Sequence, residues 1–583
     1  MKKLFLQLAV ASLLIPLHSA LSQTLSDYVK AVKGDTLVIK DYYEMNNKPN
    51  SLYWAMRLDT INVPEGRVYL LKANGYYPLA NNPATRRNTV IAGEDNTMLV
   101  QNTTASSRLP LICGAGGATG INTGGIDFAH NLTVKNCCIV PGTSDGWFGW
   151  AFFSGTANHV RLTLQNCLLE QTRWVFMTTS QSTISWHIKD CYFVNMNDNY
   201  ARRSGGVMDV FVQQDTLLVE NSTHVMAQGY VYRLRIYPFK RVIFNHNTFV
   251  NCANVVFQDY GFQSAMSVTN NIFVNCNVKP YIGVGRTIDP GEEDIDHLPV
   301  GIVNVYPDTT IHGDRKYLVD RNAVYWDPRL ADIVDTLNAK HLDGSTNWVS
   351  QMITMNQRTQ AMFDDHARYP YLTEGTWYRK AFSFTDTKDL LTSQVDTVKR
   401  YVIAVMDTGS GLCLPDWRFG SKNLIEPDWP IPVDLSYADA DLQMAGLSGF
   451  PLGDLNWFPT RKPAWLAQRT SEYERIAGAL NAGKLVAVEH DQSGLPLAFQ
   501  LRQNYPNPFN PSTIISYQLP AARFVALKVY DVLGREVTTL INELQQAGTH
   551  AVHFDGSSLA SGVYFYSLIV DEIETTKKMM LLR

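Results

Sequence analysis

The sequence lacks the short motifs that mark common nucleotide, phosphate and metal sites. It has no glycine-rich dinucleotide fingerprint, no phosphate loop and no CxxC pair of the kind that holds a metal. It also lacks a block of Lys and Arg, and its formal net charge over 583 residues is -4. Because nucleic-acid binding needs a basic patch, we expect no nucleic-acid partner.

Long apolar runs are missing beyond the first residues. Lys2 and Lys3 precede an apolar run over 4–17, and small residues at 20–22 suit cleavage. This pattern predicts a signal peptide over 1–22. The run is too short to span a bilayer and no cysteine follows the cleavage point, so we expect an exported mature chain with no transmembrane segment or lipid anchor.

What the sequence does contain is a short pattern repeated seven times. The copies begin 24 to 31 residues apart, except for a last interval of 51 that leaves room for an inserted loop or a skipped turn. Such self-similarity predicts stacked units, each too small to bury its own apolar face. The copies are 134–140, 164–170, 188–194, 219–225, 244–250, 268–274 and 319–325.

Each position of the pattern has its own residue preference. The first and sixth are mostly apolar and the second is polar, so these strands have one inward face. The third is mostly Asn or Asp, which tolerate a left-handed backbone and predict a corner. A small or amide side chain follows, which predicts a ladder of stacked groups. This fourth column holds Cys137, Cys167, Cys191, Ser222, Asn247, Asn271 and Asn322.

Two strands and a corner per turn predict a right-handed parallel β-helix over 23–326. Shorter apolar runs at 36–39, 68–71, 89–92 and 109–112 predict its first turns. Residues 36–326 resemble the pectate-lyase-type β-helix superfamily, including its asparagine ladder. We expect a mainly β protein in which this coil carries the chemistry.

Cysteines number eight, and five of them fall in rung positions of the repeat. Stacked inward thiols are more often small apolar fillers than bridges, so we expect no disulfides. A bridge between Cys252 and Cys276 on neighbouring rungs also fits disulfide geometry. The five are Cys137, Cys167, Cys191, Cys252 and Cys276.

The repeat is lost over 327–487. Helical spacing at 330–342, 386–406 and 463–482 predicts helices. Because an open coil end exposes unpaired strand groups, we interpret the region as an insert and cap. Residues 449–458 resemble the closing motif of β-helix proteins from bacteria with type IX secretion.

The C-terminal part resembles a known export signal. Beyond a linker at 488–498, residues 503–513 and later blocks resemble the type A sorting domain of the type IX secretion system. Short alternating strands broken by Asn, Gly and Pro predict a small β-sandwich over 499–583. The resemblance implies that the type IX machinery carries the chain across the outer membrane to the cell surface or beyond. It also makes Pro506, Pro508 and Gly562 turn and signal residues.

A cationic stretch at 230–241 is the strongest candidate for chemistry. Strand alternation places Arg233 and Arg235 on the same side, where two adjacent arginines could bind a carboxylate. The stretch resembles the Arg-x-Pro-x-x-Arg segment of pectate lyases, with Arg235, Pro238 and Arg241 as counterparts and one extra residue between the first two. A lyase needs such a cation as its base. The predicted catalytic residues are Arg235, Arg233, Lys240 and Arg241.

Predicted substrate-binding residues are Asp209, Asp259 and Arg173. The alternative is structural: a cationic strand face that Asp209 or Asp259 neutralises from neighbouring rungs. A hydrolase would need paired carboxyl groups, and the nearest doublet, 364–366, reads as a solvated loop. We expect His224, in an apolar column, to be a hydrogen-bonded core histidine.

Two further segments remain open between a site and ordinary structure. The acidic run 289–296 has oxygen ligands that suit calcium but no familiar ligand spacing, so a solvated loop is favoured over a site. The aromatic residues 147–150, Phe152 and Phe153 suit either sugar stacking or core packing. The sequence identifies no other cofactor.

Three hypotheses for function follow from these patterns. The first is an exported β-helix protein that binds polysaccharide, as a lyase on acidic sugar chains if Arg235 or Arg233 acts as base. The second is a non-catalytic adhesin or structural surface protein with the coil as a rigid rod. The third, contact within an envelope assembly, has no sequence feature of its own.

Overall fold

The protein is described by a computed structural model. The segments that it describes are 23–60, 63–95, 107–115, 124–142, 151–172, 174–196, 205–235, 237–259, 263–282, 298–306, 315–340, 348–408, 429–482, 500–501, 503–504, 506–519, 523–546, 548–570 and 573–582. The expected signal peptide, the linker, Arg173, the acidic run 289–296 and the aromatic run 147–150 lie outside these segments and stay predictions.

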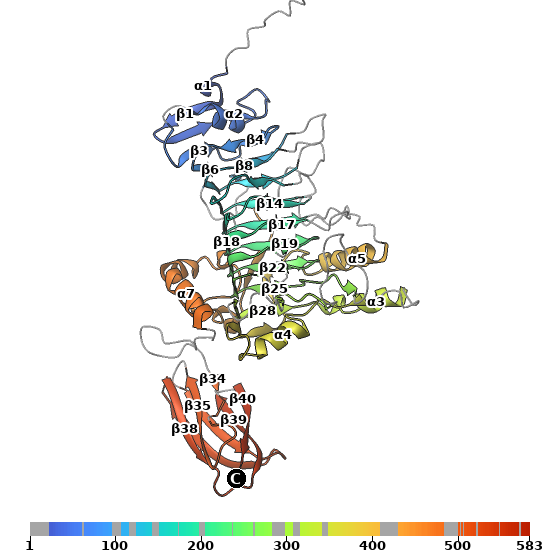
Figure 1. The fold of residues 1–583 in the computed structure, drawn as a ribbon, viewed down its shortest axis with the longest axis vertical. Helices are drawn as coiled ribbons and strands as arrows, with labels where there is room; N and C mark the ends of the chain where they lie inside the picture. The colour runs from blue at the N-terminus through green and yellow to red at the C-terminus, as the bar shows by residue number, and fades with distance from the viewer. Residues whose placement is uncertain are drawn as a thin grey trace, which may run out of the picture.

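The chain is mainly β, and most of it winds through three sheets whose strands are stacked along the longest axis of the molecule (Figure 1). We call them the long, middle and short sheets, with 12, 10 and 7 strands. From β3 to β25, successive strands belong to the long, middle and short sheet in turn. All neighbours within these sheets are parallel except β1 and β2, which pair antiparallel at one end. We call this winding the coil.

The strands of the coil are short. The long sheet contains β1 (Val29–Lys33), β2 (Thr36–Ile39), β3 (Arg67–Leu71), β6 (Thr89–Gly93), β9 (Leu132–Lys135), β12 (Arg161–Gln165), β15 (Ser185–Lys189), β18 (Gln214–Glu220), β21 (Phe239–Asn245), β24 (Ala265–Thr269), β27 (Lys316–Asp320) and β30 (Leu372–Glu374). The middle sheet contains β4 (Tyr76–Leu79), β7 (Leu111–Gly114), β10 (Cys138–Val140), β13 (Leu168–Glu170), β16 (Tyr192–Met196), β19 (Thr223–Ala227), β22 (Thr248–Cys252), β25 (Ile272–Val274), β28 (Asn322–Tyr325) and β31 (Trp377–Arg379). The short sheet contains β5 (Ala84–Thr85), β8 (Ile126–Phe128), β11 (Phe153–Gly155), β14 (Val175–Thr179), β17 (Gly206–Val210), β20 (Tyr232–Arg235) and β23 (Phe257–Asp259).

The corner between the long and middle sheets is the repeated feature that the sequence predicts. All seven third positions of the repeat have a left-handed backbone, with φ between 45° and 60°. Asn and Asp adopt this conformation readily, but His246 and Arg321 adopt it as well. The corner is therefore set by the stacking of turns, and the residue type only makes it easier.

The residue after each corner forms the predicted ladder. Asn247 donates from Nδ2 to Asn271 Oδ1 at 3.0 Å, and Asn271 donates in the same way to Asn322 at 3.0 Å. Ser222 Oγ accepts the backbone N–H of Cys191 at 3.1 Å. The following residues pair in register through every turn from Cys138 onward, so the earlier cysteines lie in the same column. The predicted ladder is confirmed.

Cys252 and Cys276 belong to a second column. Each follows a left-handed Asn at the other end of a middle-sheet strand, at Asn251 with φ 55° and Asn275 with φ 53°. They are thus equivalent to each other. They are not equivalent to Cys137, Cys167 and Cys191, although the sequence interpretation placed all five in the same rung positions. All seven cysteines in the described segments are buried with free thiols.

The short sheet adds a third strand to the turns from β5 to β23, where the repeat predicted two. The residues at the second corner are Gln171, Asn195, Met226, Asn251 and Asn275, so no single type marks it. The segments that lead back from the short sheet to the long sheet also differ in length from turn to turn. A sheet flanked by variable corners and loops leaves no fixed spacing in the sequence, which is why it was missed.

Inward side chains stack in files inside the coil. The rings of Phe193, His224, Phe249 and Phe273 lie in one file, with successive centroids 4.8, 4.4 and 5.1 Å apart. His224 is fully buried, and its Nε2 lies 2.8 Å from the hydroxyl of Tyr232. Burial lowers the pKa of His224 to about 3, so the ring is neutral. The expected core histidine is confirmed.

The region after residue 326 is more than an insert and cap. β30 and β31 extend the long and middle sheets, so these sheets continue past the point where the repeat ends. The predicted helices are present, although those at 330–342 and 386–406 are shorter than expected; α1, α2, α4 and α6 were not predicted. The helices are α1 (Leu25–Tyr28), α2 (Ser51–Leu58), α3 (Ile333–Lys340), α4 (Gln357–Asp364), α5 (Ser393–Thr408), α6 (Ala440–Gln443) and α7 (Lys462–Ala482), with 3-10 turns η2 (Pro328–Leu330) and η3 (Leu455–Trp457). The remaining short strands pair as β26 (Tyr281–Ile282) with β29 (Trp348–Val349) and β32 (Phe384–Asp386) with β33 (Asp434–Tyr437).

Residues 445–475 form a strap across the corners, which we call the corner strap. It runs back along the coil from Arg321 to Asp190, and α7 then returns in the opposite direction. Gly453 has φ 77°, and a Cβ there would lie 2.6 Å from Thr248 Oγ1, so the strap approaches the corner too closely for a side chain. Its hydrogen bonds reach Arg321, Asn270, Thr248, Asn221 and Asp190 in that order.

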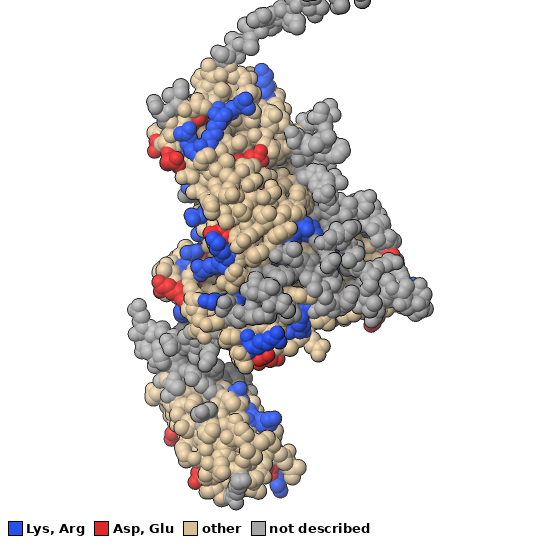
Figure 2. All heavy atoms as spheres, viewed as in Figure 1, with Lys and Arg blue, Asp and Glu red and all other residues tan. Residues whose placement is uncertain are grey.

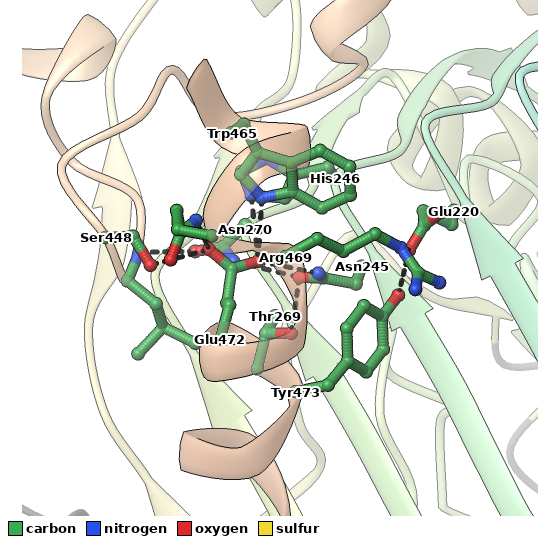
Figure 3. Close-up of polar contacts among 12 residues, drawn as sticks. Glu220, Asn245, His246, Thr269, Asn270, Ser448, Trp465, Arg469, Glu472 and Tyr473 are labelled. Atoms are coloured by element: carbon green, nitrogen blue, oxygen red, sulfur yellow. Dashed lines mark hydrogen bonds and ion pairs between the residues drawn. The ribbon is translucent and has the colours of Figure 1, made fainter. Parts of the chain in front are cut away.

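Glu472 of α7 is the centre of a buried polar network (Figure 3). Its carboxylate accepts hydrogen bonds from Asn245, Trp465 and Ser448 at 2.8, 3.1 and 2.8 Å, and His246 Nε2 lies 3.2 Å away. Burial opposes the charge, but His246 and these hydrogen bonds outweigh it and lower the pKa of Glu472 to about 2. The helix α7 thereby supplies hydrogen-bond partners for polar side chains at the corner of the coil.

The C-terminal residues form two antiparallel sheets with one shared apolar core. Leu501, Phe509, Ile515, Leu527 and Tyr566 are among its buried members. One sheet contains β34 (Gln500–Leu501), β35 (Ser512–Leu519) and β38 (Gly548–Asp555). The other contains β36 (Arg523–Tyr530), β37 (Glu536–Gln545), β39 (Gly562–Val570) and β40 (Ile573–Leu581).

Replacing a ladder amide should destabilise the coil. Asn271→Ala removes the acceptor of the Asn247 N–H at 2.9 Å and the donor to the Phe244 carbonyl at 3.0 Å, which leaves buried backbone groups unpaired. We expect a loss of roughly 2–5 kcal/mol in urea unfolding. The exposed Asn481→Ala on α7 is the control and should stay within about 0.5 kcal/mol. Equal midpoints for the two variants would contradict the ladder.

Asp454 should make stability depend on pH. Burial raises the pKa of this carboxyl to about 6, above its unfolded value of about 4. The folded state therefore keeps a proton that the unfolded state releases, and stability falls as pH rises from about 4 to about 6. Asp454→Asn should be more stable than the parent at pH 7, on the order of 2–3 kcal/mol, and this gain should shrink below pH 6. A gain that is constant from pH 4 to 7 would contradict this.

Candidate functional site

The predicted arginines lie together on the outer face of the short sheet. Arg233 and Arg235 are on β20, and Asp209 on the neighbouring β17 pairs in register with Arg233. Arg235 donates from Nε to Asp209 Oδ1 at 2.7 Å and from Nη2 to Oδ2 at 3.0 Å. Arg233 Nη1 lies 3.4 Å from the same Oδ2. One carboxylate thus receives both guanidiniums.

The ion pair is largely removed from water. The side chains of Asp209 and Arg233 are 0% and 5% exposed, whereas that of Arg235 is 21% exposed. Arg233 also donates from Nε to Gln258 Oε1 at 2.6 Å. Arg235 has φ 56°, so it ends β20 at a left-handed corner. A buried pair of this kind is costly to break from either side.

Three half-buried aromatic rings surround the ion pair. Trp174 donates from Nε1 to Asp209 Oδ2 at 3.2 Å, and its ring lies 6.1 Å from that of Phe211. The guanidinium of Arg235 lies 4.6 Å from the Phe211 centroid, and that of Arg233 lies 5.1 Å from the Tyr230 centroid. These six residues, Asp209, Arg233, Arg235, Trp174, Phe211 and Tyr230, are called the arginine cluster below.

The geometry does not prepare either arginine to accept a proton. The sequence interpretation left two adjacent arginines free to bind the carboxylate of a substrate, but both of them hydrogen-bond to Asp209. A carboxylate bound in two-point contact favours the charged guanidinium. The structure therefore agrees with the neutralised strand face, in which Asp209 is the counter-ion of both.

The other predicted site residues are not in the cluster. Lys240 and Arg241 lie on β21 of the long sheet, past the corner at Arg235, and Lys240 pairs with Asp215 at 2.7 Å. Asp259 on β23 is the register neighbour of Arg235, and it accepts a hydrogen bond from Gln263 Nε2 at 2.9 Å. The single stretch 230–241 is thus divided between two sheets.

Other candidate segments have ordinary packing where they are described. Phe152 and Phe153 are buried in the core of the coil, which agrees with the packing interpretation. Asp364 ends α4 and is exposed, as is Asp365. Among the described residues, no group of three His, Cys, Asp or Glu side chains has the geometry of a metal site.

The sequence missed the aromatic part of the arginine cluster and the polar network of the corner strap. Trp174 and Phe211 precede and follow strands of the short sheet, which has no sequence repeat. The strap does leave a signal in the sequence, because residues 449–458 resemble a known closing motif. His246, which Glu472 contacts, also stands out as an exception among the Asn and Asp residues of the third column. The contact between His246 and Glu472 joins residues 226 positions apart, so no local sequence pattern could predict it.

Charge on the visible face is dispersed. Figure 2 shows Lys/Arg and Asp/Glu side chains in small separate groups, with uncharged residues over most of the described surface of this view. The described residues in this view form no continuous basic area wide enough to bind a polyanion. Nor does any helix in the described segments have the length and apolar character needed to cross a bilayer.

Comparison with known proteins identifies the C-terminal part. Residues 503–582 match the family model described as a secretion system C-terminal sorting domain. No curated protein matches the chain. The sorting domain indicates a secreted, cell-surface protein, handled by type IX secretion and exported across the outer membrane.

Removing the shared carboxylate should reveal its structural role. Asp209→Asn leaves two guanidiniums without the charge that binds them, so we expect a loss on the order of 3 kcal/mol in urea unfolding. Asp364→Asn, at the exposed end of α4, removes the same charge and should change stability by less than about 0.5 kcal/mol. If both variants unfold at the same midpoint, the ion pair is not structural.

Proposed function

We propose that this is an exported surface protein whose coil binds polysaccharide without cleaving it. The observation that carries the proposal is the two-point contact of Arg235 with the buried Asp209. It leaves a lyase without a base at the predicted position, while Trp174, Phe211 and Tyr230 keep half-buried rings beside polar groups. Aromatic faces packed beside hydrogen-bonding groups are suited to sugar rings.

We also infer that the coil is a right-handed parallel β-helix. Support comes from the order of the strands from β3 to β25, which pass through three parallel sheets in rotation. Connections between parallel strands of one sheet are right-handed in about 98% of cases. The signal peptide and the type A class of the sorting domain belong to the same proposal and rest on the sequence motifs.

The second candidate is a rigid display rod with no ligand. It is favoured by the corner strap, which binds several successive turns together by buried hydrogen bonds. Such a rod would carry the same ladder and the same sorting domain. Binding experiments separate it from the first candidate.

A panel of acidic polysaccharides tests the proposal. The mature protein is mixed with pectate, alginate or a glycosaminoglycan, and we expect binding by calorimetry with no rise in near-ultraviolet absorbance. Trp174→Ala should weaken that binding roughly tenfold, because it removes a stacking ring. Tyr43→Ala, an exposed ring near the start of the coil, is the matched control and should bind normally.

Each other outcome has a definite meaning. Unsaturated products that absorb in the near ultraviolet would establish a lyase and overturn the non-catalytic proposal. No binding to any member of the panel would leave the display rod.

A further inference from the structure

A second surface, on the long sheet, has an unusual composition. The inward residues of β9, β12 and β15 are buried and apolar, including Leu132, Leu162 and Trp186, as strand alternation requires. The outward positions carry only cations, a histidine, hydroxyls and an amide. They are Thr133, Lys135, Arg161, Thr163, Gln165, Ser185, His187 and Lys189, which we call the basic face.

The carboxylates at the border of the basic face are already occupied. Asp190 pairs with Lys462 at 2.6 Å, and Glu220 pairs with Arg469 at 2.7 Å. Asp215 pairs with Lys240 at 2.7 Å, and Ser185 Oγ lies 3.3 Å from its Oδ2.

The cations of the basic face lack such partners. Within the described part of the chain, Lys135, Arg161 and Lys189 form no ion pair with any carboxylate. A solvated sheet face normally mixes both signs of charge, so three unpaired cations beside three neutralised acids require an explanation.

Register fixes the spacing of these groups. Lys135 pairs with Gln165 and Gln165 pairs with Lys189, so the two lysines lie in one row, two strands apart. Parallel strands are about 4.8 Å apart, which separates the two backbone positions by about 10 Å along the coil. Thr133, Thr163 and His187 form the parallel row beside them. The surface is therefore a ladder of cations and hydroxyls, not a single point of charge.

The helix α7 begins at the border of the basic face. Its first residue, Lys462, reaches Asp190, and Arg469 and Glu472 then reach Glu220 and Asn245 further along the coil. Figure 1 shows α7 beside the lower turns of the coil only. The helix thus packs against later strands of the same sheet and reaches the basic face only at its β15 edge, where Arg469 lies close enough to act on His187.

His187 responds to the surrounding positive charge. Burial, together with Arg161, Lys189 and Arg469, lowers the pKa of this half-buried ring to about 4. The ring is therefore neutral at pH 7 and can donate or accept a hydrogen bond. An anion bound on the face would offset the positive charge of the neighbouring cations and would therefore raise the pKa of His187.

We propose that the basic face binds an acidic polysaccharide that bears carboxylate or sulfate groups. Cations about 10 Å apart suit repeated charges on a chain. The hydroxyl and amide side chains between them suit sugar hydroxyls. The outward residues of the face include no Phe, Tyr or Trp, the side chains on which the bases of single-stranded nucleic acids stack. This surface goes beyond the proposed function, because it shares no residue with the arginine cluster.

A charge-matched pair of variants tests this surface. Lys135→Gln/Arg161→Gln/Lys189→Gln removes the cations, and we expect binding of the mature protein to polygalacturonate and dextran sulfate at low salt to weaken at least about tenfold. The control variant removes the same charge from three exposed lysines elsewhere and should bind like the parent. Its substitutions are Lys33→Gln, Lys48→Gln and Lys388→Gln.

The titration of His187 gives a readout that a general loss of charge would not move. In the parent, polygalacturonate should raise the NMR-detected pKa of this ring, assigned with His187→Gln, above its free value. Trp174→Ala should leave the rise unchanged, which separates this surface from the arginine cluster. Equal weakening in the triple variant and its charge-matched control would overturn the proposal.

Probe specificity provides the remaining outcomes. Neutral dextran should not bind the basic face, and single-stranded DNA should bind more weakly than dextran sulfate. DNA bound as tightly as dextran sulfate, and lost in the triple variant, would replace the polysaccharide by a general polyanion. An unchanged His187 titration in saturating polygalacturonate would exclude the face as a site, whatever happens at the arginine cluster.

Discussion

The structure depends on one backbone constraint, a left-handed residue between the long and middle sheets in turn after turn. Seven such residues, from Asn136 to Arg321, hold φ between 45° and 60°. The residue that follows points inward and hydrogen-bonds its counterpart one turn away, as Asn247 does with Asn271. Because corner and ladder satisfy each other's polar groups, the chain can turn inside a coil without leaving buried N–H groups unpaired.

The same corners explain the long-range architecture. They expose a row of polar groups outside the coil, and the corner strap satisfies that row with Asp454, Lys462 and Glu472. The strap is thus held by these polar contacts together with buried apolar side chains such as Leu452 and Trp457, which pack with residues of the middle sheet. The helix α7 begins near Asp190, and the cations of the basic face, which form no ion pair within the described segments, lie on the strands that precede this point. The long sheet thus packs against α7 along its later strands and presents the basic face along its earlier strands.

Sequence reasoning succeeds where a physical repeat leaves a repeated residue. The third and fourth columns predicted both corner and ladder, and His224 was correctly assigned to the core. It fails where position is set by partners distant in the chain. The stretch 230–241 looked like one site, but the corner at Arg235 sends Lys240 to another sheet, and Asp209 neutralises both arginines from a neighbouring turn. Strands of the short sheet had no repeat to find.

A double-mutant cycle between Asn247 and Asn271 tests the central claim most directly. Their side chains are 3.0 Å apart, buried and one turn from each other. If the ladder couples successive turns, Asn247→Ala and Asn271→Ala should be non-additive in urea unfolding, with a coupling of about 1 kcal/mol or more. Additivity within about 0.3 kcal/mol would show that each amide acts alone and that the turns do not depend on one another.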